Sequence, residues 1–192
     1  MTRLILIRHG ETDWNVEGRY QGQADPPLNA HGLEQARDLS EKLLPLKLDV
    51  VYTSPLLRAA QTAQVISERL GIPMVLEPRL MEIHQGSWQT RLRAEIQALY
   101  PDLFRQWEAA PWQVSPPNGE TLYQVQARVD AALESIIPRH RGAGIGFVAH
   151  RIPIALIKLR YQDLDRDIVR TLSLPNTYFE EIRIDPTASD HT

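Results

Sequence analysis

The feature that most constrains the fold of this 192-residue chain is a run of four apolar residues, 4–7, followed directly by Arg8, His9 and Gly10. Unbroken apolar runs of this length, partly β-branched, are typical of strands buried on both faces in a parallel sheet. In open α/β sheets, ligands bind in the crevice outside the carboxyl ends of the strands. The run therefore predicts a buried strand that ends in a cation and an imidazole at a ligand-binding edge.

Strand-like and helix-like segments alternate along the rest of the chain. Asn29 is expected to cap one helix, and Ser54 another, with Pro55 at its first position. This alternation predicts an α/β fold with a parallel sheet covered on both faces. Further strands are predicted over residues 49–53, 74–76, 144–149 and, as a possible edge strand, 177–184. Helices are predicted over residues 30–44, 55–70, 91–107 with a break near 101, 120–137 and 152–161.

Composition limits the classes of protein to which the chain can belong. Its length predicts one domain over residues 1–192, with a frayed tail after about residue 186. The absence of cysteine excludes disulfides, thiolate metal sites and a cysteine nucleophile, and fits a reducing cytoplasm. A net charge of −3 argues against a nucleic-acid partner. We expect no signal peptide and no membrane segment, because no apolar run approaches the roughly 20 residues that a bilayer requires.

Three of the predicted strands deliver cationic or imidazole side chains to the same edge of the sheet. Arg8 and His9 end the first predicted strand. Ser54 and Arg58 follow the second strand, 49–53, and His150 follows the fourth, 144–149. Arginine presents a planar fork of donors that matches phosphate oxygens. A neutral imidazole is a competent nucleophile toward phosphorus. These strand ends therefore predict a phosphate site with a possible histidine nucleophile.

A leaving alkoxide needs a proton, and Glu82, in the polar connection 77–90, is the carboxylate best placed to give it. The long polar loop 10–29 carries Trp14 and Tyr20, which we expect in a pocket wall. Two other classes remain open at this point. A metallohydrolase could bind zinc or manganese through His9, His150, Glu82 and Asp13, although two arginines would repel the cation. The second open class is a non-catalytic phosphate-binding module.

Several short motifs, in order over about residues 3–160, resemble the histidine phosphatase superfamily in its phosphoglycerate mutase-like branch. The first motif is short but specific once the others follow it. The motifs are Arg8-His9-Gly10-Glu11-Thr12 with Trp14-Asn15 and Gly18-Arg19-Tyr20-Gln21-Gly22, then Ser54-Pro55-Leu56-Leu57-Arg58-Ala59 with Thr62-Ala63, then Glu82 with Gly86 and Trp88, then Pro116-Pro117-Asn118-Gly119-Glu120-Thr121, and finally His150.

The resemblance implies a fold and an activity. The family fold is a three-layer α/β/α sandwich with a mostly parallel central sheet, and the family needs no metal. We expect no cofactor for this chain. His9 would become the phosphohistidine, and Glu82 would protonate the leaving group and later activate water. The remaining implied site residues are Arg8, Arg58 and His150 on the phosphoryl group, Asn15 as a hydrogen-bonding neighbour, and Gln21 and Gly22 near the substrate.

The chain departs from the family at two positions. Arg151 stands where glycine is common after the second histidine, so it would either crowd the phosphate or add a third cation. Gln89 and Thr90 replace a common Glu-Gly in the loop that carries Glu82. The chain lacks the longer insertion of the cofactor-dependent mutases, which favours a phosphatase of small phosphomonoesters over a phosphoglycerate mutase. A homodimer through the late strand is possible.

Overall fold

The computed structural model describes residues 1–184 of the chain, and within them five strands form one sheet in the order β3-β2-β4-β1-β5. β1 to β4 run parallel, whereas β5 lies at an edge, antiparallel to β1. The predicted late edge strand and mostly parallel sheet are confirmed, and the expected homodimer stays a prediction. The expected frayed tail lies outside the described residues. The strands are β1 (Thr2–Arg8), β2 (Val50–Thr53), β3 (Met74–Leu76), β4 (Gly144–Ala149) and β5 (Phe179–Ile184).

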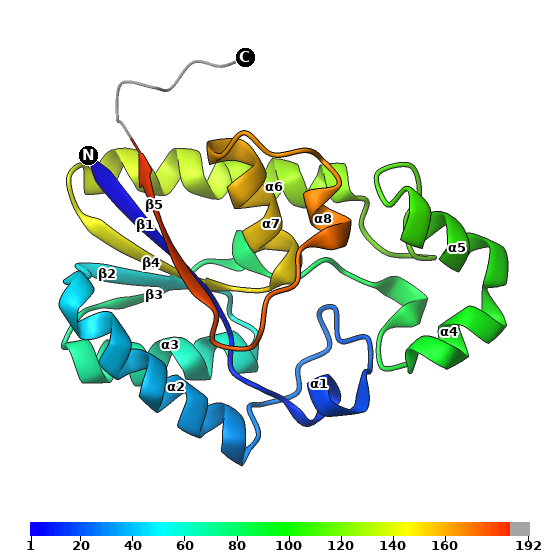
Figure 1. Ribbon diagram of the computed structural model, residues 1–192, viewed down its shortest axis with the longest axis horizontal. Helices are drawn as coiled ribbons and strands as arrows, with labels where there is room; N and C mark the ends of the chain where they lie inside the picture. The colour runs from blue at the N-terminus through cyan, green and yellow to red at the C-terminus, as the bar shows by residue number, and fades with distance from the viewer. Residues whose placement is uncertain (185–192) are drawn as a thin grey trace.

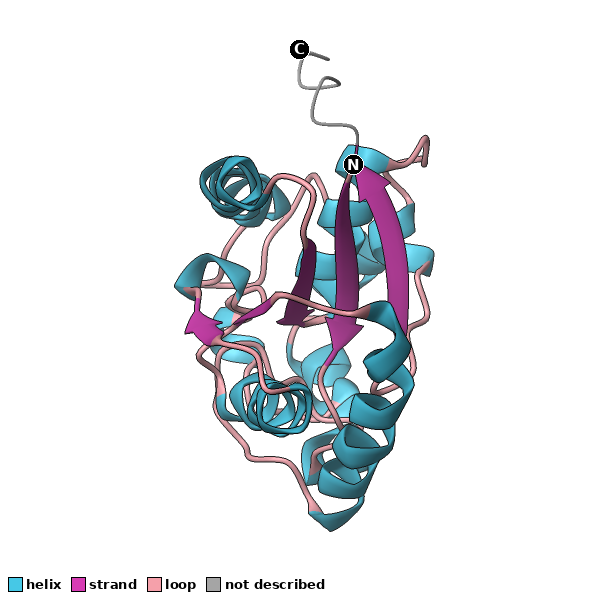
Figure 2. Ribbon diagram, turned by 90° about the vertical axis from the view of Figure 1, so that its left-hand side faces the viewer, coloured by secondary structure: helices cyan, strands magenta, loops and turns pink. Residues whose placement is uncertain are grey.

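Helices cover both faces of the sheet, which confirms the expected three-layer α/β/α arrangement. α2 and α3 lie on one face, and α6 and α7 lie on the other (Figure 1). Figure 2 shows the strands between the helices, seen from the side. The helices are α1 (Asp13–Glu17), α2 (Ala30–Leu43), α3 (Leu57–Leu70), α4 (Arg93–Leu99), α5 (Pro101–Ala109), α6 (Leu122–Ile136), α7 (Arg151–Tyr161) and α8 (Ile168–Thr171).

The alternation of side chains along β1 divides the core into two halves. Leu4 and Leu6 pack in the cluster that contains the buried faces of α6 and α7. Ile5 and Ile7 pack with α2 and α3 on the opposite side. All four side chains are fully buried, because successive residues of a strand point to opposite faces and both faces are covered. This two-sided burial explains why the run reads as continuously apolar.

Three local elements differ from the sequence prediction. The loop 10–29 contains the short helix α1, and α8 was not predicted. α3 begins at Leu57 rather than at Pro55, with Leu56 as its N-cap residue. The reason is that Ser54 continues the line of β2 by one residue, since its backbone N–H donates to the Val148 carbonyl at 3.1 Å. No helix within residues 1–184 is long and apolar enough to cross a bilayer.

The pairing register brings the ends of three strands together. Arg8 of β1 pairs with Ala149 of β4, and Thr53 of β2 pairs with Val148 of the same strand. Because β4 lies between β1 and β2, the residues that follow all three strands share one edge. Figure 1 shows α4 and α5 set apart from the sheet, on the side where the parallel strands end.

Candidate active site

His9 continues the line of β1 by one residue and is fixed by its backbone on both sides. Its N–H donates to the Ala149 carbonyl at 3.2 Å. Its carbonyl accepts the Thr177 N–H at 3.2 Å and the Asn176 side-chain amide at 3.1 Å. The segment before β5 thus clamps the residue that follows β1. The backbone of His9 has little freedom to move.

The imidazole of His9 is held in one tautomer. Its Nδ1 lies 2.7 Å from the Gly10 carbonyl, which only accepts, so Nδ1 carries the proton and Nε2 keeps a lone pair. Burial, followed by the charges of Arg58 and Arg8, holds the pKa of His9 well below its ordinary value of 6.5. The ring is therefore neutral at neutral pH, with the electron pair that a nucleophile needs.

His150 follows β4 and lies beside His9, with ring centroids 5.1 Å apart. Its side chain is fully buried, and its Nε2 lies 2.9 Å from the Ser54 hydroxyl. That hydroxyl also accepts the Leu56 N–H at 3.2 Å, and because a hydroxyl has one proton and two lone pairs it can pair with Nε2 as donor or as acceptor. Burial, then the charges of Arg58, His9 and Arg8, lowers the pKa of His150 well below 6.5.

Arg8 and Arg58 place two guanidinium groups beside the histidines. Arg58 is 1% exposed and donates to the carbonyls of Ala24 at 2.9 Å and Gly22 at 2.8 Å. Arg8 donates to the Leu174 carbonyl. Burial lowers the pKa of Arg58 to about 10, against the opposing charge of Glu82, so the group stays cationic at neutral pH. Each of the two guanidinium groups is therefore held in place by only some of its N–H donors.

A cleft of about 580 Å³ opens over this edge of the sheet. It gathers almost all of the residues that the sequence predicted for the site, and His150 lies buried behind His9 rather than in the lining. The predicted residues in the lining are Arg8, His9, Asn15, Gln21, Gly22, Arg58 and Glu82, together with the expected wall residue Tyr20. Trp14 is not among them; its ring instead lies 5.9 Å from the Arg19 guanidinium.

Asn15, Gln21 and Gly22 play different structural parts in the lining. The Asn15 side-chain oxygen accepts the Thr12 N–H at 3.1 Å and forms the capping box of α1. The Gly22 carbonyl orients Arg58. The Gln21 side-chain oxygen is buried and has no hydrogen-bond partner within residues 1–184. Of the three, Gln21 is therefore the residue with a buried polar atom that lacks a partner within residues 1–184.

Three arginines in the cleft were missed by the sequence analysis as site residues. Arg19, Arg93 and Arg170 line it together with Arg151, and we call these four the peripheral arginines. Arg151 donates to the Val169 carbonyl at 2.8 Å and pairs with no carboxylate in residues 1–184. The others pair with Glu17, Glu108 and Asp167, respectively. Of the two alternatives for Arg151, the structure supports an added cation.

The acidic and imidazole groups do not form a metal-binding arrangement in the part of the chain that is described. No group of three or more His, Cys, Asp or Glu side chains within residues 1–184 lies close enough to hold an ion. The Glu82 carboxylate accepts the N–H of Ile83 at 2.8 Å and lines the cleft. The inner part of the site thus combines the Glu82 carboxylate with two neutral imidazoles and two arginines, while Glu108, also in the lining, pairs with Arg93.

Comparison with known proteins gives a consistent family assignment. The model of the histidine phosphatase superfamily (branch 1) matches residues 4–190. Phosphoserine phosphatase 1 of Hydrogenobacter thermophilus is 40% identical over 154 residues, which cover 80% of this chain and 73% of the relative. The probable phosphoglycerate mutase GpmB of Serratia proteamaculans is 35% identical over 182 residues, covering 92% and 82%.

A solved structure agrees over nearly the whole chain. YhfR of Bacillus stearothermophilus superposes with a TM-score of 0.90 at 34% identity, and the match covers 97% of this chain and 93% of YhfR. The agreement extends across the sheet, both helical layers and the elements that surround the cleft. Fold, site geometry and sequence relatives therefore point to the same family.

Proposed function

Because the chain belongs to branch 1 of the histidine phosphatase superfamily, we propose that it is a phosphomonoester phosphatase that acts through a phosphohistidine on His9. Family membership and the phosphoserine phosphatase relative support the hydrolase activity. The histidine mechanism, its independence of metals and the substrate are our proposal. The structural support comes from the edge of the sheet where β1, β2 and β4 end.

In the first half of the reaction His9 takes the phosphoryl group. The Nε2 lone pair attacks phosphorus, and the bond between phosphorus and the leaving oxygen breaks. The Glu82 carboxylic acid gives its proton to that oxygen, so an alcohol leaves rather than an alkoxide. The fixed Nδ1–H bond to Gly10 keeps Nε2 directed into the cleft during the attack.

In the second half a water molecule hydrolyses the intermediate. The Glu82 carboxylate, now deprotonated, accepts a proton from water as the oxygen attacks phosphorus. The bond between Nε2 and phosphorus breaks, and inorganic phosphate leaves with His9 neutral again. Both halves place charge on the same phosphoryl oxygens, so fixed donors around them accelerate both.

The observation that carries the proposal is a set of buried nitrogens without partners. Arg8 Nε, Arg58 Nε and His150 Nδ1 are buried and have no hydrogen-bond partner within residues 1–184. Buried donors without partners are rare in folded proteins, and each is costly. The oxygens of a phosphoryl group on His9 would accept from both arginine nitrogens, and also from His150 Nδ1 when the ring carries its proton there. Two of the donors are permanently cationic, which suits a group of negative charge.

The peripheral arginines support a substrate with a second anionic group. Arg151 is the member without a carboxylate partner in residues 1–184, and it lies directly after His150. Phosphoserine and phosphoglycerate, which the names of two relatives mention, both carry a carboxylate besides the phosphate. We therefore place phosphorylated carboxylic acids ahead of phosphates of neutral alcohols as substrates.

The test is turnover of a phosphomonoester panel in excess chelator, with His9→Ala beside the wild-type protein. We expect wild-type turnover to survive chelation and His9→Ala to lose about 10³-fold or more, as removal of a nucleophile does elsewhere. His31→Ala, whose ring is 61% exposed on α2, is the matched control and should keep its activity. Loss of activity on chelation would contradict the proposal.

Two further outcomes have defined meanings. Binding of inorganic phosphate without any turnover by the wild type would indicate the non-catalytic module. The mutase relative makes isomerisation the second candidate activity. Incubation with phosphoglycerate separates a mutase from a phosphatase, because a mutase gives the isomer and a phosphatase gives inorganic phosphate.

A further inference from the structure

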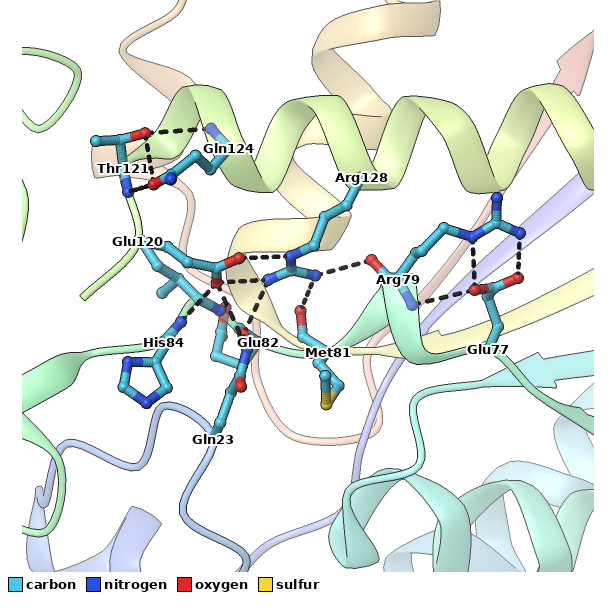
Figure 3. A network of polar contacts seen from close by, with 11 residues as sticks. Gln23, Glu77, Arg79, Met81, Glu82, His84, Glu120, Thr121, Gln124 and Arg128 are labelled. Carbon is cyan, nitrogen blue, oxygen red and sulfur yellow. Dashed lines mark hydrogen bonds and ion pairs between the residues drawn. The ribbon is translucent and has the colours of Figure 1, made fainter. Parts of the chain in front are cut away.

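Arg128 on α6 is tied to the segment that carries Glu82, although it is not in the cleft lining. Its Nη1 donates to the Arg79 carbonyl at 2.8 Å and to the Met81 carbonyl at 2.6 Å. Its Nη2 donates to the Glu82 carbonyl at 3.0 Å. Figure 3 shows this guanidinium reaching from the helix to the segment below it. One side chain therefore satisfies three backbone carbonyls around the proposed acid.

Glu120 holds the same segment on the other side of Glu82. One of its oxygens accepts Arg128 Nε at 2.9 Å. The other accepts Arg128 Nη2 at 3.0 Å and the backbone N–H of His84 at 2.8 Å (Figure 3). The side chains of Arg128 and Glu120 are only 17% and 22% exposed, so water replaces their bonds poorly. Glu82 lies between residues that this pair holds in place.

The segment needs such support because it has no regular structure of its own. Residues 81–85 belong to neither a helix nor a strand. Proton transfer to a leaving oxygen requires hydrogen-bond distance, and an error of about 1 Å costs on the order of 10²-fold in rate. The Glu82 carboxylate makes one hydrogen bond, to the N–H of the next residue, so its position follows the backbone.

We propose that Arg128 and Glu120 are positioning residues that hold Glu82 at the distance required for proton transfer to the leaving group. This inference rests on the proposed role of Glu82 as the acid. It predicts a defect confined to the proton-transfer part of the reaction. A merely structural role of the pair would impair the reaction of every substrate alike.

The leaving group separates these two roles. An alkyl alcohol is a poor leaving group without a proton, whereas 4-nitrophenolate leaves readily as an anion. The experiment therefore measures the single-turnover rate of phosphoenzyme formation on His9 from O-phosphoserine and from 4-nitrophenyl phosphate, because the later hydrolysis of the phosphoenzyme uses Glu82 as a base whichever group has left. The variants compared with the wild type are Glu82→Gln, Arg128→Gln, Arg128→Lys and the double variant of Glu82→Gln with Arg128→Gln.

We expect Arg128→Gln to show the same pattern as Glu82→Gln. Both should lose about 10²-fold in the rate of phosphoenzyme formation from phosphoserine and less than about threefold in that from 4-nitrophenyl phosphate. Arg128→Lys, which keeps a cation with fewer donors, should recover part of the loss. The double variant should be no slower with phosphoserine than Glu82→Gln alone, because the acid that Arg128 positions is then already absent.

Arg79→Gln is the matched control. The Arg79 side chain pairs with Glu77 (Figure 3). It also contacts the same helix, at the Ala131 carbonyl and the Ser135 hydroxyl, but it makes no bond to residues 81–84. It should keep the wild-type ratio of the two rates even if the protein becomes less stable.

The possible failures are distinguishable. Equal losses of Arg128→Gln with both substrates would overturn the positioning role. If Glu82→Gln itself shows no preference for the activated substrate, the proposed acid is wrong. Should Arg128→Gln not fold, the ratio of rates in Arg128→Lys decides, and a wild-type ratio there with folded protein would reject the inference.

Discussion

At the scale of single residues, Arg151 marks where this chain departs from the common pattern of its family. It begins α7 directly after His150 and lines the cleft, with one Nη bound to the Val169 carbonyl. That bond holds the Arg151 side chain against the residue before Arg170. The two arginines therefore lie on neighbouring parts of the cleft wall. The substitution thus adds charge to the cleft and leaves Arg8 and Arg58 in place.

Arg151→Gln should change substrate preference and leave the chemistry intact. A hydrogen bond to a charged group is worth about 1.5–3 kcal/mol, so we expect kcat/KM for O-phosphoserine to fall about tenfold or more. Phenyl phosphate, which has no second anion, should change less than about twofold, and His9 should still be phosphorylated. Steady-state kinetics on both substrates provide the measurement.

The control is Arg105→Gln on α5, whose side chain is 75% exposed and pairs only with Asp102 and its own helix. It should leave both substrates unaffected. An equal fall for phosphoserine and phenyl phosphate in Arg151→Gln would mean that the arginine supports the fold of the site and does not select substrate.

The sequence predicted the residues that directly follow strands, and it missed those whose place depends on tertiary packing. Arg8, His9 and His150 are fixed by the strand ends, which apolar runs reveal. Arg93 and Arg170 reach the cleft only because α4 and α8 fold over it. The helical period of a sequence does not indicate which exposed arginines of the helix will face a neighbouring element.

At the scale of elements, the start of α2 supports the loop that follows His9 by direct backbone contact. A Cβ on Gly32 would lie 2.1 Å from the Glu11 carbonyl oxygen, and a Cβ on Gly10 would lie 2.6 Å from the Gly32 carbonyl oxygen. Asn29, which caps the helix as predicted, also donates from its side chain to the Glu11 carboxylate at 3.0 Å. Glu11 is thereby held as part of the scaffold.

Gly32→Ala should therefore destabilise the protein, contrary to the usual effect of that change in a helix. Alanine is ordinarily favoured over glycine within helices by about 1 kcal/mol. Here the added methyl group collides with backbone that cannot move without shifting residues 9–11. We expect a loss of about 1–3 kcal/mol in the free energy of unfolding, in the range of overpacked sites, and a lower kcat.

Urea unfolding and steady-state kinetics of Gly32→Ala check this expectation. Gln35→Ala is a useful comparison on the same helix, because it removes one hydrogen bond to the Glu11 N–H without adding bulk. A gain in stability for Gly32→Ala would show that the loop yields easily and that the close contact is unimportant.

Long elements were predicted well and short ones poorly, for a physical reason. α2 and α6 carry apolar stripes with capping residues, and their predicted ranges agree with the structure to within about two residues. α1 and α8 have five and four residues, too few to show a helical period, and packing determines them. The break near Pro101 was predictable because proline disfavours a helical residue before it, here Tyr100.

At the scale of the whole molecule, two buried neutral histidines make stability depend on pH. The pKa values of His9 and His150 lie well below 6.5 in the folded protein, and an exposed ring in the unfolded chain titrates near 6.5. As pH falls below that value the unfolded chain binds protons that the folded one does not. Stability is therefore complete above about pH 6.5 and is lost as pH falls toward the folded-state pKa values.

Between about pH 7.5 and pH 5.5 each ring that stays neutral in the folded state should cost about 1.4 kcal/mol of stability. Urea midpoints across this range provide the measurement. His9→Asn and His150→Asn should each remove about half of the dependence. The wild-type slope in both variants would contradict the assignment to the buried pair.

The clamp on His9 also has a consequence for when the enzyme becomes active during its synthesis. Asn176 donates to the carbonyl of a residue 167 positions earlier, and the Leu174 carbonyl accepts from Arg8. In a chain made from its N-terminus, His9 is synthesised early, whereas the residues that clamp its backbone and Arg8, 174–177, come only shortly before β5. A nascent chain that stops before residue 174 would contain Arg8, His9, Glu82 and His150 without this clamp, and we expect it to show no phosphatase turnover.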